Sequence, residues 1–110
     1  IKNKKMRKIL KFNKATGGAN DANVMYYVSA DEIKYFESGD KTCTIFIMGA
    51  GADGLKLDTI IITGGTGQGD EIADKLAELI HANKFAGGGA MFTIDVNFVA
   101  GITKIDYQAV

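Results

Sequence analysis

Apolar and polar side chains alternate with a period of two through the middle of the chain. The stretches TCTIFIM, residues 42–48, and LKLDTIIIT, residues 55–63, are rich in β-branched residues and alternate between two faces. Short connections built around glycine, at residues 37–40 and at the Asp-Gly pair of residues 53–54, are typical of hairpins. We therefore predict one continuous antiparallel meander over residues 26–63.

The chain before this meander predicts two further strand segments. Ile9, Leu10 and Phe12 indicate a short first strand, and the turn-forming stretch NKATGGAND, residues 13–21, predicts a mobile loop after it. Residues 23–28 are apolar on both faces, which is typical of a strand in a closed or doubly covered sheet. Residues 29–32 are polar, and the apolar pattern then resumes with a change of phase, which indicates a turn or bulge.

A helical period occurs once, in the stretch DEIADKLAELIHANK. Acidic residues at its start and His81 and Lys84 at its end complement the helix dipole, so we predict an amphipathic helix over about residues 70–83. Residues 91–98 alternate again, and Gly101 permits a return, so a C-terminal hairpin should complete the sheet. The apolar stripe of the helix consists of Ile72, Leu76, Leu79 and Ile80.

These elements predict a mainly β, α+β fold in a single domain of 110 residues. We expect a small, strongly bent antiparallel sheet or barrel, with one amphipathic helix before the C-terminal hairpin. The 14 glycines and the absence of proline fit many tight turns. A single cysteine favours a reducing compartment, and no apolar run is long enough to span a bilayer. We expect a soluble cytoplasmic protein, or a virion-associated one if it is phage-encoded.

Charge is divided unevenly along the chain. Seven of the 13 basic residues lie in positions 1–14, and the remainder carries 6 basic against 13 acidic residues, a balance of −7. We expect residues 1–8 to form a basic, partly flexible arm. Such an arm can meet phosphates, an acidic face of a neighbouring copy, or only water.

The glycine-rich stretch TGGTGQGDE, residues 63–71, runs from a predicted strand into the predicted helix. A phosphate-binding loop has this outline, but Asp70 and Glu71 stand where lysine and a hydroxyl residue are required. A flexible strand-to-helix connection is the favoured interpretation. His81 and Cys43 lack the spacing of zinc or nucleophile motifs, and we expect His81 to satisfy helix-end carbonyls and Cys43 to be a buried thiol.

No catalytic constellation assembles from these residues, so we predict a protein that is not an enzyme and has no metal, cofactor or small-molecule substrate. Aromatic residues on strands can stack single-stranded bases, although the sheet core or a subunit contact is the favoured role here. The candidate contacts for nucleic acid or a protein partner are Lys4, Lys5, Arg7, Lys8, Lys11, Tyr26, Tyr27 and Tyr35.

Residues 28–80 carry a resemblance to known small β proteins. The element SADEIKYFE, residues 29–37, the strand TCTIFI, residues 42–47, and the acidic start of the helix look like short proteins of tailed, especially marine, bacteriophages. More loosely they resemble a small flagellar-operon family and Sm-like small β-barrels. The Sm-like families imply bent sheets, rings assembled by strand-edge pairing and, in many members, RNA binding. Their Asp and Asn RNA-contact motif is absent here, and the helix comes late in the chain.

Two functions follow as hypotheses. The first is a non-catalytic, self-associating assembly module, a phage-type structural or accessory protein whose exposed strand edge, unprotected by proline, pairs with copies of itself. The alternative is an Sm-like module that binds RNA or single-stranded nucleic acid through the basic arm.

Overall fold

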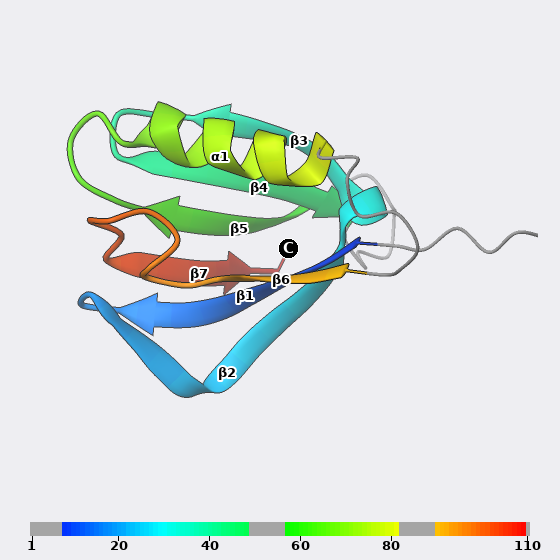
Figure 1. The fold of residues 1–110 in the computed structure, drawn as a ribbon, viewed down its shortest axis with the longest axis horizontal. Coiled ribbons are helices and arrows are strands. Elements are labelled where there is room, and N and C mark those ends of the chain that lie inside the picture. Colours follow the sequence, from blue (N-terminus) through cyan, green and yellow to red (C-terminus); the bar gives the residue numbers. More distant parts are fainter. Residues whose placement is uncertain (1–7, 49–56, 82–89, 110) are drawn as a thin grey trace, which may run out of the picture.

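The computed structural model describes residues 8–48, 57–81 and 90–109 of the chain. These residues form one sheet with a single α-helix packed against it (Figure 1), which confirms the predicted mainly β, α+β class. Within the described ranges, no helix is long and apolar enough to cross a membrane. The elements are β1 (Lys8–Thr16), β2 (Ala19–Ser29), the 3₁₀ helix η1 (Ala30–Glu32), β3 (Ile33–Ser38), β4 (Thr42–Met48), β5 (Leu57–Thr63), α1 (Gly69–His81), β6 (Ala90–Ile94) and β7 (Lys104–Gln108).

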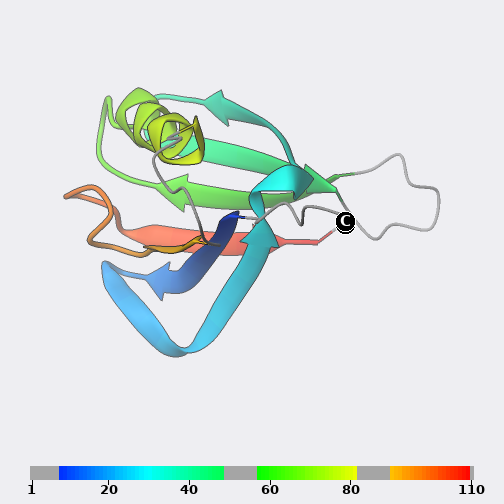
Figure 2. The same cartoon turned by 45° about the vertical axis from the view of Figure 1, so that its right-hand side comes forward.

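The strands are ordered β2-β1-β7-β5-β4-β3, with β6 beside β1. The sheet is strongly curved, but β2 and β3 lie at its two ends and do not pair, so it is not closed into a barrel (Figures 1 and 2). Of the two predicted forms, the open bent sheet is the one observed. α1 covers β3 and β4, on one face of the sheet.

The predicted meander is confirmed for β3, β4 and β5 and is wrong for β2. Between β2 and β3 the chain crosses from one end of the sheet to the other through η1. Ser29 caps η1 by accepting from the Asp31 N–H, and the Glu32 carboxylate accepts from the Ser29 N–H in return. This capping box ends β2 and redirects the chain, which confirms the turn predicted at the polar interruption, and a register shift between Ile33 and Tyr35 follows in β3. The turn predicted at residues 53–54 lies outside the described residues.

The predicted C-terminal hairpin is also wrong. β6 pairs in parallel with β1, and β7 pairs antiparallel with β5. After β6 the chain turns at Asp95, whose carboxylate and carbonyl accept from the N–H groups of Asn97 and Phe98. The alternation at residues 96–98 belongs to this loop, because its apolar side chains pack on the core from outside the sheet.

The stretch predicted as a mobile loop, residues 13–21, is part of the β1–β2 hairpin. Gly17 and Gly18 form its turn with φ of 62° and 83°, which glycine adopts without a Cβ penalty. Between the pairs Asn13↔Met25 and Ala15↔Asn20, β2 has four residues against one in β1. The buried Asn13 amide enters this bulge and donates to the Asp21 and Val24 carbonyls at 2.6 and 3.4 Å.

The core includes buried side chains of the sheet and of α1. Ile45, Ile60 and Ile62 of the sheet, and Ile72 and Leu76 of α1, have no exposed surface. Each contributes about 1.5–3 kcal/mol relative to an exposed position. The predicted helix stripe is confirmed by this burial, and the helix itself runs from Gly69 to His81.

Candidate functional site

The glycine-rich connection between β5 and α1 is held by hydrogen bonds within the protein. The N–H groups of Gly64 and Gly69 donate to the carbonyls of Lys41 and Asp40, at 2.7 and 3.3 Å, and that of Gly67 donates to the Asp40 carboxylate at 3.0 Å. Gln68 closes the loop by accepting from the Gly65 N–H at 2.6 Å. These donors are the ones a phosphate would need, and they are used to join the loop to the β3–β4 turn.

Cys43 and His81 lie in different surroundings. Cys43 is fully buried in β4, as predicted, and its burial raises the pKa of the thiol to about 12, so it stays protonated. His81 is exposed at the last residue of α1. The helix-end carbonyl of Ile80 accepts a hydrogen bond from the Lys8 ammonium group of β1. Among the described residues, no three or more His, Cys, Asp or Glu side chains form a group that could hold a metal ion.

The predicted contact residues that the structure describes are distributed over different parts of the sheet. Lys4, Lys5 and Arg7 lie outside the described residues. On the β1–β2 side, the Lys11 ammonium lies 5.8 Å from the ring centroid of Tyr27, which is 58% exposed.

The other two tyrosines belong to different parts of the fold. Tyr26 stacks on Tyr107 of β7, with ring centroids 5.1 Å apart. Tyr35 stacks on Phe46 at 4.5 Å, near the β3 end of the sheet. Lys11 and Tyr27 are thus two candidate contact residues whose side chains lie against each other.

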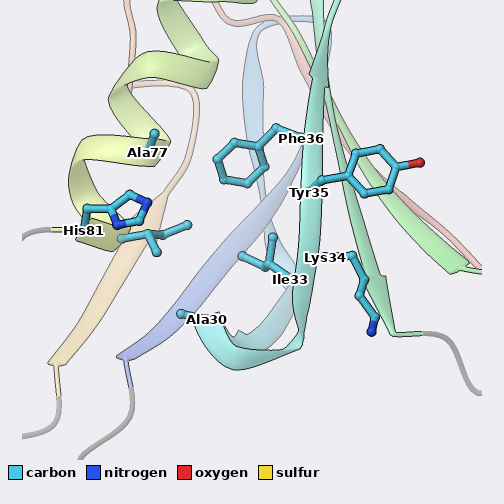
Figure 3. Close-up of a pocket in the computed structure, with 8 residues that line it drawn as sticks. Ala30, Ile33, Lys34, Tyr35, Phe36, Ala77 and His81 are labelled. Carbon is cyan, nitrogen blue, oxygen red and sulfur yellow. The ribbon is translucent and has the colours of Figure 1, made fainter.

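An apolar groove runs beside β3, the edge strand. It has a volume of about 350 Å³ and lies between β3 and the C-terminal half of α1. Figure 3 shows Ile33 and Phe36 turned toward Ala77 and His81 of the helix, while Tyr35 points the opposite way. Among the described strands, β3 pairs with β4 alone, so its outer backbone edge borders this groove.

The other face of this end of the sheet is open. Tyr35, Phe46 and Thr59 stand opposite one another across β3, β4 and β5, on the face away from α1. Tyr35 and Met48 are 50% and 57% exposed, which is unusual for large apolar or aromatic side chains on neighbouring strands. Strand β3 is thus flanked by apolar surface on both sides.

A second pocket of about 300 Å³ lies between the ends of β2, β4 and β7 and beside η1, all on one side of the molecule (Figure 2). Tyr26, Tyr27, Tyr107 and Glu32 are among the residues that line it. The Tyr107 hydroxyl donates to Asp58, which is 6% exposed. This hydrogen bond, followed by burial and the negative charges of Asp58 and Glu32, raises the pKa of Tyr107 to about 12.

Sequence reasoning missed the roles of Asp58, Tyr107 and Asn13. A signal for Asp58 was present, because it stands two residues before Ile60 and therefore on the face of β5 that faces the core. A carboxylate at such a position needs a buried partner. Its partner Tyr107 lies 49 residues away in sequence, on a strand whose neighbour was predicted wrongly.

Comparison with protein-family models, with curated proteins and with solved structures gives no match for this chain. The resemblance to phage proteins and Sm-like barrels stays a prediction, and function must be argued from the geometry.

Proposed function

We propose that this protein is a non-catalytic assembly module that associates with itself through the β3 edge. The observation that carries the proposal is the position of β3: its partner on one side is β4, and its other side borders an apolar groove. A strand added there gains backbone hydrogen bonds and also covers apolar surface on both faces of the sheet.

A second copy is the occupant that fits this edge. Two β3 strands paired antiparallel about a two-fold axis make one continuous sheet, with both α1 helices on the same face. Each groove, with Ile33, Phe36, Ala77 and Ile80 at its base and wall, is then covered by the helix of the other copy. The opposite face joins the two Tyr35–Phe46 ring stacks into a wider apolar surface.

The other end strand, β2, is less suited to pairing. Its bulge at residues 21–24 breaks the regular spacing of backbone groups and bends the strand (Figure 1). Bulged edges are a common protection against strand addition. β3 also has one irregularity, between Ile33 and Tyr35, and is regular from there to Ser38.

Light scattering on the full chain tests the proposal. We expect about twice the chain mass of 11.7 kDa at micromolar concentrations. Ala77→Arg places a charge in the groove and should give the monomer mass, whereas Asp74→Arg, on the exposed part of the same helix, should not. A single 11.7 kDa particle for the unchanged protein, at every concentration tested, overturns the proposal.

One observation favours nucleic acid as a second candidate partner. Lys11 and the exposed Tyr27 offer a cation and an aromatic face beside the point where residues 1–7 join β1. Binding of single-stranded RNA should weaken with salt and with Tyr27→Ala, but not with Tyr35→Ala, an equally accessible tyrosine elsewhere on the sheet. Equal effects of the two substitutions would remove this candidate.

A further inference from the structure

The second pocket is lined by polar and aromatic residues, Tyr26, Tyr27, Glu32 and Tyr107, where apolar side chains would be enough for packing. The stacked rings of Tyr26 and Tyr107 meet Glu32 at the ends of strands from both halves of the curved sheet, and Tyr27, whose ring is on the opposite face of β2, also borders the pocket. Val28, Ile47 and Met48 supply the apolar remainder of its wall. At about 300 Å³ it is at the small end of ligand-binding cavities.

Negative charge is concentrated at this pocket. Glu32 lines it, and Asp58 lies directly behind the Tyr107 hydroxyl, to which it is hydrogen-bonded. The hydrogen bond to Asp58, burial and the negative charges of Asp58 and Glu32 raise the pKa of the Tyr107 phenol, which lines the pocket. An anionic ligand would meet like charge there, whereas a cation would gain from both groups.

Aromatic faces select the kind of cation. A small hydrated metal ion is best held by several oxygens at close range, whereas ring faces attract ammonium and guanidinium groups, which shed water more readily. Such a contact is present nearby, on the outer face of β2, where the Lys11 ammonium lies 5.8 Å from the ring centroid of Tyr27. We propose that this pocket binds an organic cation, an alkylammonium or guanidinium group, through Glu32 and the rings of Tyr26 and Tyr107.

The chain itself contains one source of such groups. Residues 1–7, which lie outside the described residues, include Lys2, Lys4, Lys5 and Arg7 and join β1 at Lys8. β1 begins beside the end of β2, where Ile9 pairs with Ser29, and η1 with Glu32 follows directly. The other source is a free amine or guanidinium compound from solution.

Amide chemical-shift titration of the full chain with methylguanidinium tests the site, with sodium chloride at matched ionic strength as the reference. We expect saturable shifts that include Val28, Glu32, Ile47 and Tyr107, and no such shifts with sodium. Glu32→Gln removes the charge but keeps the oxygen that caps η1, and should weaken binding about five- to tenfold. Glu37→Gln, an exposed carboxylate of β3 that does not line the pocket, is the matched control.

A second variant separates the two sources. In the full chain with Lys2, Lys4, Lys5 and Arg7 all replaced by Gln, tighter binding of methylguanidinium identifies the chain's own segment as the natural occupant. Unchanged binding identifies a cation from solution. Absence of saturable shifts in both forms, or equal weakening by Glu32→Gln and Glu37→Gln, overturns the proposal. These results are distinguishable from those on association of the β3 edges, since Ala77 lines the groove beside β3 and not this pocket.

Discussion

Gly69, the first residue of α1, lies against the backbone of Gly39 in the β3–β4 turn. A Cβ placed at position 69 would be 1.9 Å from the Gly39 carbonyl oxygen and 2.6 Å from that of Thr42. The approach allows the Gly69 N–H to donate to the Asp40 carbonyl. Glycine is therefore required here because the helix start packs closely on the turn. Backbone conformation is not the reason, since the φ of Gly69 is not in the left-handed region.

Gly69→Ala should lower the free energy of unfolding by about 1–3 kcal/mol, because backbone must move to admit the methyl group. Urea denaturation measures this loss. Asp74→Ala, at an exposed position of the same helix, is the control and should stay within about 0.5 kcal/mol of the unchanged protein. Equal stability of the two variants would contradict the packing seen at Gly69.

Asn13→Ala should cost about 1–3 kcal/mol, because the Asp21 carbonyl in the β2 bulge loses its amide donor at a buried position. Asn23→Ala, at an exposed position of the same bulge, should change stability little. Thermal unfolding of the two variants is the measurement. If Asn23→Ala proves the more damaging, the bulge is not held by Asn13.

Tyr107→Phe keeps the ring that stacks on Tyr26 and removes the hydroxyl that donates to buried Asp58. We expect a loss of about 1–3 kcal/mol, because a buried carboxylate loses a hydrogen bond. Tyr27→Phe, at an exposed ring of the same pocket, is the matched control. A neutral Tyr107→Phe in chemical denaturation would show that the hydroxyl does not stabilise Asp58.

Stability should fall as the pH rises from about 9 to about 12. The pKa of Cys43 rises from 9.0 to about 12 on folding, and that of Tyr107 from 10.0 to about 12. Between these values the unfolded chain has released protons that the folded chain retains, so each increment of pH favours unfolding. Denaturation across this range should show a shallower decline for Cys43→Ala and for Tyr107→Phe. A double variant with the same decline as the unchanged protein would exclude both groups as its cause.

Local pattern was sufficient for the elements whose partners are near in sequence. β3, β4 and β5 alternate with period two and follow one another in the sheet, and the stripe of Ile72 and Leu76 placed the helix. The same alternation led to a wrong strand prediction at residues 96–98. Apolar side chains alternate there because they pack on the core from a loop. Nothing local distinguishes the two cases.

The candidate sites were less predictable than the fold. The groove beside β3 combines residues 30–36 with residues 77–81, and the tyrosine pocket combines residues 26–32 with residues 47–48 and Tyr107. Each depends on which strand ends the sheet and on where η1 carries the chain. The capping box at Ser29 is visible in the sequence and marks the point where the chain leaves β2. The position of β3 at the far end of the sheet depends in addition on the pairing of β1 with β2 and β7.

The parallel pairing of β1 with β6 has a consequence for how the protein is made. β1 occupies residues 8–16, but its neighbours β6 and β7 begin at residues 90 and 104. While the ribosome is still producing the intervening residues, β1 and β2 form only a two-stranded hairpin, which is marginally stable alone. Nascent chains therefore carry an uncovered apolar strand until β6 and β7 have been synthesised, and before that stage chaperones, or another nascent chain, have access to it.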